Sequence, residues 1–186
     1  MSINKIQSSI NHIIQRFSEN PYNYFYEEDI RVELGMDLLS EFEKISCTHY
    51  DRIIKTSPIK FEYPSQQSNK QRHDIVLLKP ESAKNIYKLE LSSAIELKLG
   101  SRIYDRCSDF KEDIRKLLGY SYDEFIGVAL YFYQDVIDSN LFTIWFNDIV
   151  ESFENIRGVN NIKINYGLNT FIILPSEILK VIKLKI

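Results

Sequence analysis

The chain contains little of the chemistry that builds cross-linked or metal-clipped scaffolds. Its two cysteines, Cys47 and Cys107, lie far apart in 186 residues, without a CxxC pair or a histidine cluster. Neither a disulfide framework nor a zinc site is therefore expected, and both residues are expected to be half-buried thiols. Six glycines and five prolines give little sign of disorder, and 44% hydrophobic residues can form a core without cross-links.

The sequence also shows no pattern typical of a targeting segment or a membrane-spanning segment. The first residues, MSINKIQSS, lack the apolar centre of a signal peptide, and no apolar run approaches the roughly 18 residues of a membrane span. A cytoplasmic protein with no membrane partner is expected. Because no repeat, linker or low-complexity stretch divides the chain, residues 1–186 are predicted to form a single domain.

An excess of positive charge is a third absence. The net charge of −3 and the isoelectric point near 5.7 argue against a protein that coats nucleic acid through overall basicity. These values do not exclude a local basic cleft. Enzymes that hydrolyse phosphodiesters with metal ions carry carboxylates at their centre, and these lower the net charge.

Apolar residues recur at helical spacing in four segments. The second of these segments carries Glu27, Glu28 and Asp29 in its first turn, where the helix dipole favours negative charge. The predicted helices run from Ile3 to Phe17, ending before Pro21; from near Tyr24 through Ile45; from Ile103 to Leu117, closed by Gly119; and from Asp138 or Ser139 through Phe153, with Trp145 in the core.

Strands are predicted where apolar residues alternate or form short continuous runs. The run from Phe125 to Tyr133 is typical of a strand buried on both faces. Helices and strands in this order predict an α/β fold with a mixed central sheet flanked by helices. The other predicted strands are Ile59–Tyr63, Arg72–Leu78, Lys88–Leu99, and approximately Asn161–Tyr166 and Asn169–Leu174, with a polar loop from Ser65 to Gln71 and a helical turn or tail from Ser176.

The strand from Lys88 to Leu99 carries the candidate site. Its apolar residues, from Leu89 through Leu91, Ile95 and Leu97 to Leu99, are predicted on one face. Glu96 and Lys98 lie two residues apart, so both are predicted on the other face, which lines solvent or a cleft.

Asp74 lies in the preceding predicted strand. If the two strands are hairpin neighbours, Asp74 and Glu96 can share one metal ion, with the backbone carbonyl of Leu97 as a further ligand. Oxygen ligands of this kind suit Mg²⁺ or Mn²⁺.

RHDIVLL followed by AIELKLG resembles the motif of the PD-(D/E)XK, or restriction endonuclease-like, superfamily, with Asp74, Glu96 and Lys98 at the motif positions. The resemblance implies an αβββαβ core and a metal-dependent nuclease. YEEDIRVEL resembles the acidic helix element that often completes such sites. Glu27 fits its register as a further catalytic residue and metal ligand, and Glu28 is the alternative. His73 stands where the motif name places proline.

The chemistry accounts for these residue types. Metal ions held by the carboxylates can lower the pKa of bound water and stabilise the attacking and leaving oxygens. Lys98 would orient or deprotonate that water, or neutralise the phosphate. His73 is interpreted as a strand-edge or supporting group rather than a general base. The opposing interpretation makes Glu96 and Lys98 an exposed ion pair worth about 0–1 kcal/mol.

The helix after this strand carries many charges of both signs. We interpret it as a solvated mixed-charge face, with phosphate contact as the alternative. Its basic residues are Arg102, Arg106, Lys111, Arg115 and Lys116, interleaved with Asp105, Asp109, Glu112 and Asp113.

Two functions follow from the sequence. The first is a Mg²⁺-dependent endonuclease acting on DNA, in restriction, phage defence or recombination, as a homodimer or within a larger nuclease complex. The second is an inactive nuclease-fold module that binds protein or nucleic acid, because a fold does not guarantee activity. The intact set of Asp74, Glu96 and Lys98 favours the first.

Overall fold

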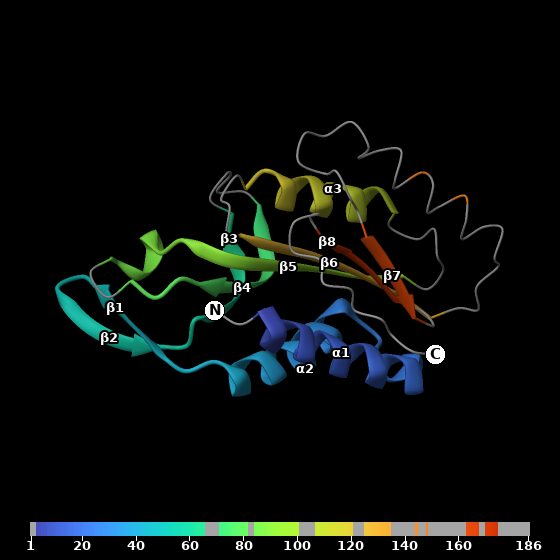
Figure 1. Cartoon of the computed structure of the whole chain (residues 1–186), viewed down its shortest axis with the longest axis horizontal. Helices are drawn as coiled ribbons and strands as arrows, with labels where there is room; N and C mark the ends of the chain where they lie inside the picture. The colour runs from blue at the N-terminus through green and yellow to red at the C-terminus, as the bar shows by residue number, and fades with distance from the viewer. Residues whose placement is uncertain are drawn as a thin grey trace.

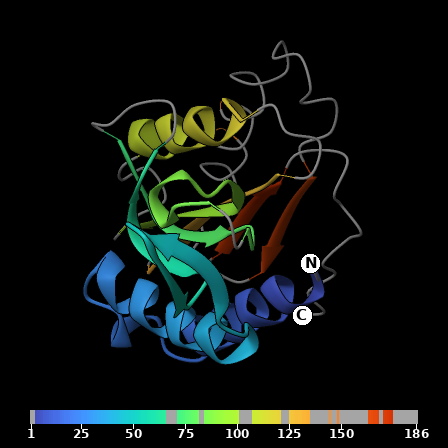
Figure 2. The ribbon, with the colours of Figure 1, turned by 90° about the vertical axis from the view of Figure 1, so that its left-hand side faces the viewer.

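The computed structural model arranges the chain in three layers, with helices on both faces of a central sheet (Figure 1). It describes residues 3–65, 71–81, 84–100, 107–120, 125–134, 144, 148, 163–167 and 170–174, and for 3, 107, 163–167 and 170–174 the backbone alone. Helices α1 and α2 cover one face and α3 covers the other, as the end-on view in Figure 2 shows. The predicted α/β class with a mixed, helix-flanked sheet is confirmed.

The helix bounds agree with the apolar periodicity at the start of the chain. Helix α1 spans Ile3–Glu19, and the 3₁₀ turn η1, Pro21–Asn23, follows it, so the predicted end before Pro21 is confirmed. Helix α3 spans Cys107–Leu118. Residues 101–106, where this helix was predicted to begin, lie outside the described residues, and so does the predicted helix around Trp145 except for Ile144 and Asp148.

Helix α2 spans Glu27–Glu41 and is shorter than predicted at both ends. The Asp29 carboxylate accepts the backbone N–H groups of Phe25 and Tyr26, which fixes the start. Phe42 adopts an extended backbone and ends the helix, so the predicted continuation through Ile45 is wrong.

A six-stranded sheet forms among the described residues, in the order β3-β4-β5-β6-β8-β7. Strands β5 and β6 are parallel, and the other neighbours are antiparallel. A separate hairpin, β1-β2, extends beyond the sheet (Figure 1). The bounds are β1 Ile45–His49, β2 Arg52–Thr56, β3 Ile59–Pro64, β4 Arg72–Leu78, β5 Leu91–Gly100, β6 Ile126–Tyr133, β7 Lys163–Gly167 and β8 Thr170–Leu174.

Two features of β5 correct the prediction. The strand begins at Leu91 rather than Lys88, because the 3₁₀ turn η2, Ile86–Lys88, precedes it. A β-bulge then shifts the register, since Leu77 pairs with Ser93 but Leu78 pairs with Leu91. The extra residue turns Leu91 toward the α3 face, so its predicted place beside Ile95 is wrong.

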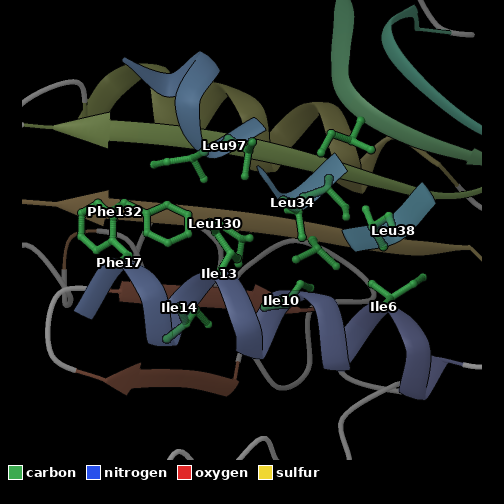
Figure 3. Packing of buried hydrophobic residues seen from close by; sticks show 14 of the residues in the cluster. Ile6, Ile10, Ile13, Ile14, Phe17, Leu34, Leu38, Leu97, Leu130 and Phe132 are labelled. Atoms are coloured by element: carbon green, nitrogen blue, oxygen red, sulfur yellow. The ribbon is translucent and has the colours of Figure 1, made fainter. Parts of the chain in front are cut away.

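Helices α1 and α2 bury their apolar faces against the sheet, as Figure 3 shows. Phe17 at the end of α1 packs against Phe132 of β6, with 4.9 Å between the ring centroids. On the other face of the sheet, α3 contributes its own apolar residues to a second cluster, in which Cys47 is fully buried rather than half-buried. The α3 residues of that cluster are Phe110, Ile114 and Leu117.

Strand β6 is buried on both faces, as predicted. Val128, Leu130 and Phe132 belong to the α1-α2 side, whereas Ala129 and Tyr131 belong to the α3 side. None of the described helices is long and apolar enough to cross a membrane.

Leu34 and Leu39 of α2 allow a matched stability test. Leu34 is 0% exposed and Leu39 is 41% exposed. We predict that Leu34→Ala lowers the free energy of unfolding by about 2–5 kcal/mol, because it leaves a cavity between α2 and the sheet. Leu39→Ala should cost about 1 kcal/mol or less. Urea unfolding followed by circular dichroism measures both, and equal losses would contradict the packing of α2.

Candidate active site

Strands β4 and β5 separate at Asp74. Their paired register reaches Ile75 opposite Ile95 and stops there. Beyond that point the N–H of Leu97 donates to Asp74 Oδ2 at 2.7 Å. The pKa of Asp74 is raised above its usual value, because the effect of burial exceeds the opposite effects of this hydrogen bond and of Lys98. The carboxylate is thus held at the backbone of β5, and its side chain is 19% exposed.

Glu27 reaches the same strand from the first turn of α2. Its Oε2 accepts the N–H of Leu99 at 3.3 Å, and its Oε1 lies 3.5 Å from Lys98 Nζ. Glu28, the alternative, instead pairs with Arg31, and its side chain is 54% exposed. The structure therefore brings Glu27 to β5 and leaves Glu28 at the surface.

Lys98 is a buried cation between two acids on different helices. Its Nζ lies 2.9 Å from Asp113 Oδ2 on α3 and 3.5 Å from Glu27 on α2. Burial lowers the pKa of Lys98, but Asp113 and Glu27 outweigh it and the net pKa is raised. Lys98 is therefore protonated at neutral pH, so of its predicted roles charge neutralisation is favoured over deprotonation of water.

Glu96 is bonded through both carboxylate oxygens. Oε1 contacts His73 Nδ1, and Oε2 accepts from Lys116 Nζ at 2.7 Å. Its exposed fraction is 1%, and burial raises its pKa well above the usual value despite Lys116. The prediction that this face lines solvent or a cleft is wrong for Glu96 and Lys98, because side chains of α3 cover them. Glu96 pairs with Lys116, whereas Lys98 pairs with Asp113 and Glu27, so the two residues do not form the ion pair of the opposing interpretation.

His73 is fully buried and uses both ring nitrogens. Nε2 lies 2.7 Å from the Tyr120 hydroxyl, opposite the bond to Glu96. Burial, followed by the charge of Lys116, lowers its pKa to about 4. The neutral imidazole can donate from Nδ1 to Glu96 and accept the Tyr120 O–H at Nε2. His73 therefore positions Glu96, in agreement with the supporting role inferred from its place in the strand.

Asp113 and Lys116 of α3 complete the site, and the sequence prediction missed both. Lys116 Nζ lies 3.3 Å from Asp113 Oδ1, and the two side chains are 9% and 11% exposed. The predicted solvated face is thus wrong for these two residues. Their spacing beside Ile114 and Leu117 was the available signal, because it places them at the edge of the apolar stripe.

Arg31 covers Asp74 from α2. Its guanidinium lies 3.9 Å from Asp74 Oδ1 and pairs with Glu28 and Glu62. Glu62 has a left-handed backbone, with φ 48°. In the β3-β4 ladder Phe61 pairs with Ile75 and Tyr63 pairs with His73, and the ladder skips Glu62 and Asp74 between them.

Within the part of the chain that the structure describes, no three His, Cys, Asp or Glu side chains are grouped to hold a metal ion. Both oxygens of Glu96 are bonded to His73 and Lys116. The structure thus brings Asp74 and Glu27 to the residues of β5 on either side of Lys98, whereas Glu96 bonds Lys116 of α3.

No protein-family model, curated protein sequence or solved structure matches the chain significantly.

The buried His73 makes stability depend on pH. Its pKa is about 4 in the folded chain and near 6.5 when unfolded. Between these values the unfolded state binds more protons, so this group's contribution to the free energy of unfolding should fall as pH falls from about 6.5 to 4. Glu96 acts in the opposite sense, because its pKa is raised.

We therefore predict that His73→Gln makes stability less sensitive to acid than it is in the parent chain, measured by urea unfolding at about pH 7 and pH 5. Histidine NMR titration gives the pKa directly, with His73→Gln assigning the signal. A His73 signal titrating near its ordinary value of about 6.5 would contradict the buried neutral imidazole.

Proposed function

We propose that the chain is a Mg²⁺-dependent nuclease that hydrolyses phosphodiester bonds in DNA. The observation that carries the proposal is the convergence of three side chains on one stretch of β5. Asp74 bonds the N–H of Leu97, Glu27 bonds the N–H of Leu99, and Lys98 contacts Glu27. Asp74 from β4 and Glu27 from α2 thus bond the backbone N–H groups on either side of Lys98 in β5.

The order of elements supports a restriction endonuclease-like core. From α2 the chain passes through the separate β1-β2 hairpin and then through β3, β4, β5, α3 and β6, so α2, α3 and these four strands of the six-stranded sheet follow one another in an αβββαβ order. Asp74 lies on the middle one of the three consecutive strands, and Glu96 and Lys98 lie on the next. These are the strands to which the resemblance assigns the motif residues.

The site offers oxygen donors of the type that a hard divalent cation prefers, although among the described residues no three acids are grouped around one point. The charges of Glu27 and Asp113 raise the pKa of Asp74, and the charge of Asp74 raises that of Glu96, although burial is the largest cause in both cases. A divalent cation would relieve this repulsion between carboxylates. Asp74, Glu27, Glu96 and the Leu97 carbonyl would hold it, and Glu96 would exchange Lys116 for the ion. Bound Mg²⁺ or Mn²⁺ supplies an activated water and a counter-charge for the developing anion.

Lys98 supplies a fixed positive charge to this site. Its contacts with Asp113 and Glu27 hold the ammonium in place before any substrate binds. A preorganised cation stabilises the transition-state phosphate without reorganising during the reaction. We assign Lys98 this role rather than that of a base.

The alternative function is an inactive module of the same fold that binds protein or nucleic acid. One observation favours it, since both oxygens of Glu96 already have protein partners. In that case the buried charges would be structural. Incubating the purified chain with plasmid, linear and branched DNA, in Mg²⁺, Mn²⁺ or chelator, separates the two functions. Cleavage that chelation abolishes supports the nuclease, and its absence with every substrate supports the module.

We predict that Asp74→Asn and Lys98→Ala both abolish cleavage but differ in metal binding. Asparagine keeps an oxygen for the Leu97 N–H while losing the charge that binds the cation, so calorimetric Mg²⁺ affinity should fall. Lysine supplies no ligand atom, so Lys98→Ala should keep that affinity. Exposed Lys88 provides the control, because Lys88→Ala should cleave like the parent chain. Undiminished cleavage by Lys98→Ala would reject the site.

Glu27 and Glu28 provide a second matched pair. We predict that Glu27→Gln lowers kcat/KM for cleavage by about 10- to 100-fold, because Glu27 holds Lys98 and a ligand position. Glu28→Gln should have little effect, since Glu28 contacts Arg31 at the surface. If Glu28→Gln lowered kcat/KM more than Glu27→Gln, the assignment of the Glu27 face of α2 to the site would be wrong.

A further inference from the structure

A groove of about 580 Å³ lies between β3 and η2, beside the candidate site. We call it the β3 groove, and its volume falls in the range of small-ligand pockets. The residues that matter for its chemistry are Lys60, Glu62, Tyr63, Arg72, Ile86 and Tyr87.

The backbone of Glu62 shapes the groove. Before it, the Phe61 ring packs over Gly35 of α2. After the left-handed residue, Tyr63 instead packs with the cluster on the α3 side, and its hydroxyl donates to the Ile86 carbonyl at 3.3 Å. Regular alternation would have placed the Tyr63 ring on the same face of β3 as Phe61. The left-handed backbone of Glu62 is a kink in β3, and it turns the Tyr63 ring into the groove instead.

Two cations of the groove lack an acid partner among the described residues. Lys60 Nζ donates to Thr56 Oγ1 at 2.7 Å, and Arg72 donates to the backbone carbonyl of Glu62 at 2.7 Å. The carboxylate of Glu62 is paired with Arg31. Burial partly desolvates the charge of Lys60 and lowers its pKa, and no carboxylate of the described residues pairs with it. In a chain of net charge −3, this local excess favours an anionic ligand.

Exposed rings extend from the groove along the β1-β2 hairpin. Tyr87 is 74% exposed and Tyr50 is 81% exposed, and the His49 ring lies between them. Its centroid is 5.8 Å from that of Tyr87 and 4.6 Å from that of Tyr50. The N–H of Thr48 donates to the Lys84 carbonyl at 3.0 Å, which holds the hairpin against the segment before η2.

We propose that the β3 groove and this row of rings bind an unpaired segment of a nucleic-acid strand. Its phosphates would lie at Lys60 and Arg72, and its bases would stack on Tyr63, Tyr87 and the His49-Tyr50 pair. Unpaired bases fit this surface better than a duplex, because stacking needs free base faces and a duplex presents base edges. The combination of aromatic faces with a local positive charge is typical of single-strand binding.

The groove adjoins the candidate site through two contacts. Arg72 directly precedes His73 and Asp74, and its carbonyl accepts from Lys116 Nζ at 2.7 Å. Arg31 links Glu62 at the groove to Asp74 at the site. The assignment of the bound strand as substrate rests on the proposed nuclease function. The substrate class would then be DNA with a single-stranded portion next to the scissile bond.

Binding can be measured without cleavage. The full chain is titrated in chelator into a fluorescein-labelled oligothymidylate of about 15 nucleotides, and anisotropy gives the affinity. We expect Tyr87→Ala to weaken binding by roughly five- to hundredfold, and Tyr22→Ala, with a similarly exposed ring (67%) outside the groove, to leave it unchanged. Lys60→Met should reduce the salt slope by about one, and Lys44→Met should not.

The outcomes separate this proposal from the nuclease function. Weaker binding by Tyr87→Ala and a smaller salt slope for Lys60→Met, in a parent chain that cleaves no DNA, support the groove and reject the nuclease. If the parent chain shows metal-dependent cleavage and both variants bind as the parent does, the groove proposal is rejected and the nuclease proposal stands. Equal competition by an unlabelled duplex of the same length would overturn the preference for unpaired bases. No binding of the oligothymidylate by the parent chain would also overturn the proposal, and it would favour a protein partner for the exposed rings.

Discussion

Strand β5 carries charges through the centre of the fold, and the surrounding elements must compensate them. Glu96 and Lys98 are 1% and 8% exposed, and a buried charge without a partner costs several kcal/mol. Helix α2 supplies Glu27, and α3 supplies Asp113 and Lys116. The result is an alternating series of acids and bases that crosses from one helical layer to the other through the sheet. The ion pairs of β5 thus join both helices to the sheet in addition to the apolar clusters.

The same compensation limits what the site can do chemically. Lys98 stays protonated because of its acidic partners, and His73 stays neutral with both nitrogens engaged. Neither is suited to accept a proton from water in this arrangement. A nuclease mechanism would therefore depend on the carboxylates and the ion they hold, and the exchange of Lys116 for that ion at Glu96 would be its first requirement. The released ammonium would then be a second cation near the phosphate.

The parts of the fold that obey simple periodicity could be predicted, and those set by tertiary contacts could not. Apolar spacing located α1, and the continuous apolar run located β6. No residue type marks the bulge at Ser92, whose hydroxyl bonds the Leu77 carbonyl, so the face of Leu91 was missed. The candidate acids on α2 and β4 were found because a strand motif and a helix register specify them. Asp113 was missed because a charged helix position is more often solvated than paired with a buried lysine.

The kink at Glu62 connects the candidate site with the β3 groove. A left-handed glutamate costs of order 1 kcal/mol and persists only where its surroundings require it. Here Arg31 holds the Glu62 carboxylate, and β3 skips its pairing with Asp74. Asp74 is thereby free of regular pairing on both sides, since its ladder with β5 has also ended. The Asp74 carboxylate bonds the Leu97 N–H at the point where the β4-β5 ladder has ended. On the other edge of β4, the left-handed Glu62 turns Tyr63 into the groove. Two neighbouring departures from regular sheet geometry, one on each edge of β4, therefore place the acid and the aromatic ring.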